Sequence, residues 1–113
     1  LTVVYNATTW DVCKNITSNR TPRAVAFDAF REKLVVADEH AAVIYDTTSW
    51  EPILQLPIHG APPDANLVVA FNGIASLLAI GTDVTTHIYD VHSRMMLHNV
   101  QRSERTTAIC FGG

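Results

Sequence analysis

Short apolar runs separated by turn residues occupy the chain, and the clearest series is Asn66–Val100, NLVVAFNGIASLLAIGTDVTTHIYDVHSRMMLHNV. It contains four apolar or alternating runs that each end at a turn signal, and none is long and periodic enough to be a helix. The first three runs are nearly continuously apolar, which is typical of strands covered on both faces, whereas the fourth is more polar. The pattern therefore predicts four antiparallel β-strands with the fourth at an exposed edge.

The same pattern recurs along the chain. Val25–Leu56 superposes on Val69–Val100 without a gap, so that the letters VAF and IYD recur 44 residues apart. The opening VVYNATTWDVCKNI matches the second half of this unit at a spacing of 40 residues, and the closing AICFGG matches its beginning. The chain is thus half a unit, two full units and the start of another.

A period of about 40 to 45 residues with four strands per repeat is typical of β-propeller blades. We therefore predict an all-β fold of four-stranded antiparallel sheets, forming two complete blades and flanking half-blades. The predicted parts are the end of a blade at 1–20, complete blades at 24–57 and 67–101, and the first strand of a further blade at 107–113. A propeller ring needs about four to eight blades. We expect the remaining blades to come from the rest of a longer chain or from other chains.

The stretch Leu77–Asp90, LLAIGTDVTTHIYD, resembles the second and third strands of the WD-repeat family. A small-residue and Gly ending leads to a turn residue, Asp83, and then to the pair Tyr89-Asp90, which stands where the family has Trp-Asp. Tyr replaces Trp in all three copies, Asn6 replaces the Asp in the first copy, and Glu39 stands at the place of Asp83 in the preceding unit.

The resemblance implies propeller blades and a protein-binding role, but the family's Gly-His pair is absent ahead of the first strands. We therefore do not expect its buried network of Asp, His and hydroxyl groups. The letters VIYDTT also resemble strands of bacterial YVTN-type surface or lactonase-like propellers, and this alternative stays open.

Composition narrows the classes of partner. Of 113 residues, 48% are hydrophobic and 17% charged, the formal net charge is −3 and the pI is near 5.9. There is no basic excess for direct binding to nucleic acid or anionic membranes, and no apolar run long enough to cross a membrane. Two cysteines are too few for a disulfide framework and fit a reducing compartment, so we expect an intracellular protein of the cytoplasm or nucleus.

Established catalytic motifs are missing from the sequence: it has no G-x-S-x-G, phosphate-binding Gly-rich loop, H-E-x-x-H or C-x-x-C. We expect no catalytic residue, cofactor or metal. Cys13 and Cys110 fall on strands that are far apart in a propeller, so no disulfide is predicted between them. His87 and His98 are predicted to face each other across a hairpin, about 5 Å apart at Cβ. Without a third ligand they make a poor zinc site, and we interpret them as a cross-strand pair.

Two sets of residues are candidates for binding partners. Four arginines lie in or beside the links between one blade and the next, and these links emerge on one face of a propeller: Arg20, Arg23, Arg102 and Arg105. We interpret them first as solvated loop charges, since Asp38, Glu39 and Asp83 are expected on the same face and can neutralise them. The alternative is a binding patch for an acidic peptide or a phosphorylated partner, which arginine would contact in a planar bidentate way. Trp10 and Trp50 occupy equivalent turns on the opposite face, where each is either a lid over its hairpin or an anchor for a partner.

These observations favour a non-enzymatic WD-repeat-like scaffold that mediates protein–protein interactions within a multi-subunit complex. The alternative is a propeller enzyme or a secreted ligand-binding propeller, which would need carboxylates or histidines converging on the inner ends of the first strands. Those strands, VAFD, VAFN and AICF, offer only Asp28 and Asn72. A third possibility is a truncated set of blades that closes by self-association.

Overall fold

The computed structural model describes residues 1–17, 21–28, 32–58, 67–72, 76–82 and 85–101. These residues form ten β-strands and no helix. The strands are β1 (Thr2–Tyr5), β2 (Val12–Ile16), β3 (Ala24–Asp28), β4 (Lys33–Ala37), β5 (Ala41–Asp46), β6 (Pro52–Pro57), β7 (Leu67–Asn72), β8 (Leu77–Thr82), β9 (Thr85–Asp90) and β10 (Met95–Gln101).

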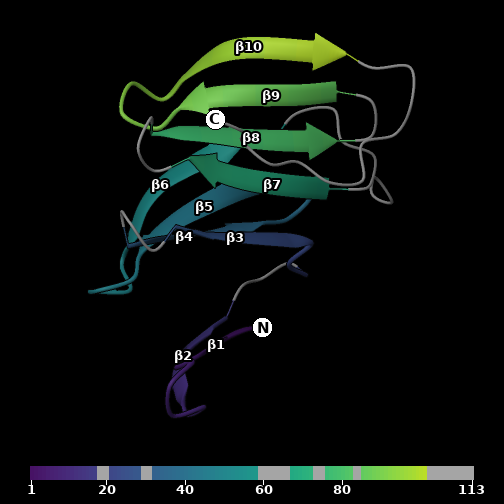
Figure 1. Ribbon diagram of the computed structural model, residues 1–113. Coiled ribbons are helices and arrows are strands. Elements are labelled where there is room, and N and C mark those ends of the chain that lie inside the picture. Colours follow the sequence, from purple (N-terminus) through teal and green to yellow (C-terminus); the bar gives the residue numbers. More distant parts are fainter. Residues whose placement is uncertain (18–20, 29–31, 59–66, 73–75, 83–84, 102–113) are drawn as a thin grey trace.

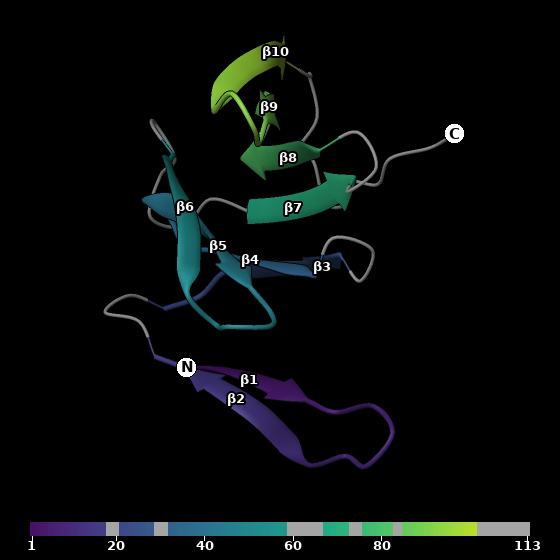
Figure 2. The same ribbon diagram turned by 90° about the vertical axis from the view of Figure 1, so that its left-hand side faces the viewer.

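Three antiparallel sheets are stacked in chain order (Figures 1 and 2): the hairpin β1–β2, the sheet β3–β4–β5–β6 and the sheet β7–β8–β9–β10. Each four-stranded sheet is a meander in which every strand pairs with the next one along the chain. The fold class predicted from the repeat is confirmed. The fourth strands, β6 and β10, lie at sheet edges as predicted, and Pro52 is the first residue of β6, where its missing N–H is tolerated.

Burial follows the predicted coverage in the second strands and in β6, whereas the first strand β3 is exposed on one face at Val25 and Phe27. The second strands, β4 and β8, are inner strands of their sheets and are buried at every position after the first; the sheet that contains β4 is packed on both faces. The edge strand β6 instead alternates, with Leu54 and Leu56 buried between exposed neighbours. In the sheet β3–β6, a continuous apolar run therefore marks the inner strand β4 and an alternating pattern of burial marks the edge strand β6.

The main core lies between the two four-stranded sheets. One face of β3–β6 contributes a group of buried small and branched side chains, and β7–β10 contributes Leu67, Leu78 and Ile80. Val35, Leu78 and Ile80 are at most 1% exposed. The members from the first sheet are Val35, Ala37, Ala42, Ile44, Leu54 and Leu56, with Ile58 just beyond β6.

A second, smaller core joins the hairpin β1–β2 to the opposite face of β3–β6. Ile16 of β2 is buried with Leu34 and Val36 of β4, and Val4, Tyr45 and Trp50 pack around them. The middle sheet is thus packed on both faces, as the propeller prediction requires. Within the described ranges, no helix is long and apolar enough to span a membrane.

Candidate interaction surfaces

The turns between third and fourth strands share one hydrogen-bonded design. In each turn a side-chain Oδ1 accepts two backbone N–H bonds: Asn6 from Thr8 and Thr9 at 2.8 and 3.1 Å, Asp46 from Thr48 and Ser49 at 2.7 and 3.3 Å, and Asp90 from His92 and Ser93 at 2.8 and 3.2 Å. Asn6, which departs from the Asp of the repeat, therefore keeps the same function. The recurring residue after Tyr shapes the turn through its side-chain oxygen.

Each of these turns ends on a residue with a left-handed backbone. Trp10, Trp50 and Arg94 have φ of 64°, 62° and 64°, and each donates its N–H to the backbone oxygen of the turn's Asn or Asp at 2.6 to 2.8 Å. Glu32 and Ser76 form a second equivalent pair, at φ 53° and 55°. All five non-glycine residues with positive φ in the described structure therefore occupy positions that recur in the repeat.

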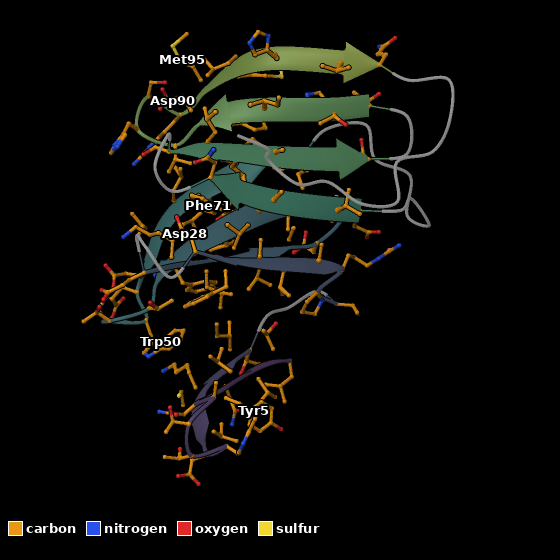
Figure 3. All side chains as sticks on the ribbon, in the orientation of Figure 1. Tyr5, Asp28, Trp50, Phe71, Asp90 and Met95 are labelled. Carbon is orange, nitrogen blue, oxygen red and sulfur yellow. The ribbon has the colours of Figure 1, made fainter. Side chains whose placement is uncertain are left out.

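The two tryptophans differ in their surroundings although their backbones match. Trp50 is half-buried and packs against the smaller core, and Figure 3 shows it between β3–β6 and the hairpin. Trp10 is 73% exposed. Trp50 is therefore placed as a lid over its neighbouring core, whereas Trp10 is displayed to solvent at the corresponding place on the hairpin.

A β-bulge follows each of these turns on the outer strand. The register between the third and fourth strands shifts by one residue, because one residue of the fourth strand has no Cα partner on the third. These residues are Cys13 in β2, Ile53 in β6 and Leu97 in β10, at equivalent positions. Bulges increase the local twist and make an edge strand a poor template for pairing with another sheet. All three bulged residues are exposed, and Cys13 is a free thiol. The prediction that Cys13 forms no disulfide with Cys110 concerns a second cysteine that lies outside the described residues.

The bulge at Leu97 makes the predicted pairing of the two histidines wrong. His98 lies opposite Ile88, and His87 lies opposite Asn99, so the two imidazoles project from opposite faces of the sheet. The His87 ring instead stacks on Tyr89, with centroids 6.4 Å apart, and its Nδ1 lies 2.9 Å from the Met96 sulfur. Burial raises the pKa of the Tyr89 phenol above its ordinary value of 10.0.

Exposed apolar side chains gather on the outer strand β10. Met95, Met96 and Leu97 are 64%, 48% and 48% exposed in one consecutive run, and Figure 3 places Met95 at the outer edge of the stack. The equivalent run in the preceding unit is Glu51, Pro52 and Ile53, in which the one exposed large apolar residue is Ile53 at 45%. We call Met95–Leu97 the rim strip.

The predicted arginine surface falls mostly outside the described residues, which include neither Arg20 nor Arg102 nor Arg105, and Asp83 is also outside them. Arg23 is exposed just before β3, where its backbone N–H donates to Ala37 O at 2.8 Å. In the β4–β5 turn the capping carboxylate is Asp38, one residue earlier than Glu39: its Oδ1 accepts N–H bonds from His40 and Ala41 at 2.7 and 3.0 Å. The arginine role stays a prediction.

A shallow hollow of about 410 Å³ lies beside this turn, lined by Asp38, His40, Ala41, Val43, Gln55 and Pro57. The His40 Nε2 lies 3.3 Å from a Glu39 carboxylate oxygen at its rim. In the described part of the chain, no three His, Cys, Asp or Glu side chains are grouped so that they could hold a metal ion. The described surfaces therefore offer exposed apolar side chains and hydrogen-bonded turns.

No protein-family model matches the chain, and no curated protein matches it. Hydrazine synthase of Kuenenia stuttgartiensis is similar in structure, with a TM-score of 0.67, 8% identity, and coverage of 87% of this chain and 28% of that chain. Sqt1 of Saccharomyces cerevisiae is also similar, with a TM-score of 0.70, 7% identity, and coverage of 93% and 30%.

Both of these proteins contain β-propellers, and at such low identity the likeness concerns the fold alone. The chain has the fold of propeller blades. It spans less than a third of the length of either structure.

Proposed function

We propose that this chain belongs to an intracellular, non-enzymatic scaffold of the WD-repeat type, which binds other protein chains within a multi-subunit complex. The observation that carries the proposal is the rim strip: Met95, Met96 and Leu97 are consecutive, apolar and about half to two-thirds exposed. A soluble protein rarely displays such a run on an edge strand without a partner, because it leaves apolar area in water.

The chemistry of the rim strip favours a protein partner. Methionine side chains are flexible and polarizable, they adapt to irregular apolar surfaces, and they are enriched in interfaces. His87 and Tyr89 lie behind Met96 and give the strip a partly buried base. The turn design around Asp90 and the likeness to Sqt1 support the WD-repeat type as the nearest kind of propeller.

The experiment is affinity purification of the tagged full-length protein from its own cells, followed by quantitative mass spectrometry. We expect a protein partner in near-stoichiometric amount that is reduced at least about tenfold by the double variant Met95→Lys and Met96→Lys, since charges would be placed in an apolar interface. Glu51→Gln combined with Gln55→Lys is the matched control, because together they change the net charge by the same amount at exposed sites in the preceding unit. A set of partners that is unchanged by the double variant would contradict the proposal.

A further inference from the structure

The two methionines of the chain are neighbours on the outer strand β10, and their side chains meet different surroundings. Met95 is 64% exposed and lies opposite Asp90, whereas Met96 is 48% exposed and lies opposite Tyr89. The Met96 sulfur lies 2.9 Å from His87 Nδ1, and the His87 ring is itself stacked on Tyr89. The Met96 thioether is therefore half exposed and held against an imidazole nitrogen.

The repeat does not need this imidazole–thioether contact. In the preceding unit the equivalents of His87 and Met96 are Val43 and Pro52, which offer neither a ring nitrogen nor a sulfur. The two sheets have the same strand order and the same turn, so the blade is built equally well without the pair. A contact that the fold does without is a candidate for chemistry of its own.

The contact borders the junction between the two four-stranded sheets. Tyr89 packs against the main core, which lies between the sheets β3–β6 and β7–β10. His87 and Met96 share its face, because successive side chains of a strand alternate between faces and Met96 lies opposite Tyr89. The sulfur is therefore reached from solvent on one side and is fixed by the sheet on the other.

An exposed thioether reacts with hydrogen peroxide to give methionine sulfoxide. A sulfur lone pair forms the new S–O bond and the O–O bond breaks, so that sulfur loses two electrons and the peroxide gains them. The proton of the transferred oxygen passes to the departing hydroxide, which leaves as water. Negative charge develops on the peroxide oxygens during this step, and an N–H donor beside the sulfur stabilises it.

We propose that Met96 is a site of oxidation to the sulfoxide by hydrogen peroxide, and that the His87 imidazole directs the reaction to Met96 rather than to Met95. His87 does so when its Nδ1 carries a proton, which it donates as a hydrogen bond first to the peroxide oxygen and then to the sulfoxide oxygen. Oxidation places a polar group in the rim strip and thereby weakens the binding of an apolar partner. This last consequence rests on the proposed function.

The experiment treats the folded full chain with hydrogen peroxide and follows each methionine by tandem mass spectrometry. Trypsin cleaves after Arg94 and Arg102, so both methionines lie in one peptide, MMLHNVQR, whose fragment ions separate the two sulfoxides. We expect Met96 to be oxidised at least about threefold faster than Met95, although Met95 is the more exposed. In concentrated urea the two rates should become equal, because the contact with His87 is lost. A folded chain in which Met95 reacts as fast as Met96 would overturn the proposal.

The variant that tests the role of the imidazole is His87→Phe, which keeps a ring beside Tyr89 and removes the nitrogen. We expect it to slow the oxidation of Met96 at least about threefold and to leave the rate at Met95 unchanged. If this variant does not fold, as judged by circular dichroism, His87→Val replaces it, since valine fills the equivalent place in the preceding unit.

His98→Phe is the matched control, because it removes the neighbouring imidazole on the opposite face of the same sheet. It should alter neither oxidation rate. An unchanged rate at Met96 in the His87 variant, or an equal loss in the His98 variant, refutes the direction of the reaction by His87.

The effect on a partner is measured separately, on the complex captured from cells. Peroxide should release the partner from the parent chain and from Met95→Leu but not from Met96→Leu, which keeps an apolar side chain without an oxidisable sulfur. Release that Met96→Leu fails to prevent contradicts the consequence for binding. If no partner is captured at all, the proposed function fails, whereas the oxidation rates of the chain alone still decide the modification site.

Discussion

Trp10 and Trp50 form a matched pair in which the backbone is the same and only the packing differs. Both have a left-handed φ, 64° and 62°, at the end of equivalent turns. A left-handed backbone costs a non-glycine residue about 1–2 kcal/mol, and glycine removes most of this cost while it adds freedom to the unfolded chain. These backbone contributions are the same for Trp10→Gly and Trp50→Gly, so they cancel in the difference.

The difference in packing can be estimated from exposure. Trp10 is 73% exposed, and Trp50 is half-buried against Leu34, Val36 and Ile16. A fully enclosed tryptophan buries up to about 250 Å², so Trp50 buries roughly 80 Å² or more beyond what Trp10 buries. At about 25 cal/mol per Å², we expect Trp50→Gly to lower the free energy of unfolding by about 2 kcal/mol more than Trp10→Gly.

The assay is urea unfolding followed by far-UV circular dichroism, which does not depend on the fluorescence of the residue removed. Arg94→Gly is the control, because Arg94 has the same φ of 64° and is exposed, so it reports the backbone contribution without an aromatic ring. We expect Trp10→Gly and Arg94→Gly to lie within about 1 kcal/mol of the parent chain. Equal losses from the two tryptophan variants would refute the assignment of Trp50 as a lid.

Two further predictions concern a turn and the core. The pKa of Asp46 lies below its ordinary value of 3.8, mainly because the carboxylate accepts backbone hydrogen bonds from Thr48 and Ser49. The ionised Asp46 carboxylate therefore stabilises the folded chain fully above pH 3.8, and this stabilisation is lost as the pH falls through the lower pKa of the folded state. Asp46→Asn keeps the acceptor oxygen, as Asn6 does, but has no carboxylate that titrates. The urea midpoint of this variant should therefore fall less steeply than that of the parent chain between about pH 5 and about pH 2, and equal slopes of midpoint against pH would contradict this. Leu78→Ala should cost about 2–5 kcal/mol in urea unfolding because Leu78 is 0% exposed between the sheets, whereas Met95→Ala should cost under about 0.5; a small loss for Leu78 would place the core elsewhere.

The repeat made the blades predictable because the residues that recur are those that build them. A central strand must be apolar on both faces and a turn needs a side-chain oxygen at a set place, so the run LVVA and the Asp after Tyr45 carry local signals. Each signal rests on a few neighbouring residues. Strand order then followed from the spacing, and the edge positions of β6 and β10 followed from the more polar fourth run and from Pro52.

The register beyond each turn had no comparable signal. A bulge is commonly marked by Gly, whereas Cys13, Ile53 and Leu97 are ordinary strand residues, and the left-handed positions are occupied by Trp and Arg. The pairing of His87 with His98 was wrong by one residue because the bulge lies between them and the turn. Similarly, both Asp38 and Glu39 are acidic, and only geometry distinguishes the one that caps the turn.

Positions that differ between the two units show that the outer faces of the two four-stranded sheets pack against different surfaces. Leu54 and Leu56 of β6 are 7% and 4% exposed because the following sheet covers them. Their equivalents on β10 are His98, which is exposed, and Val100, which is half-buried. A surface that covered the outer part of β7–β10 in the same way would have to provide a partner for an imidazole, since a buried polar group without a hydrogen bond is costly. The two junctions are therefore not interchangeable, although the sheets that form them are built from one repeat.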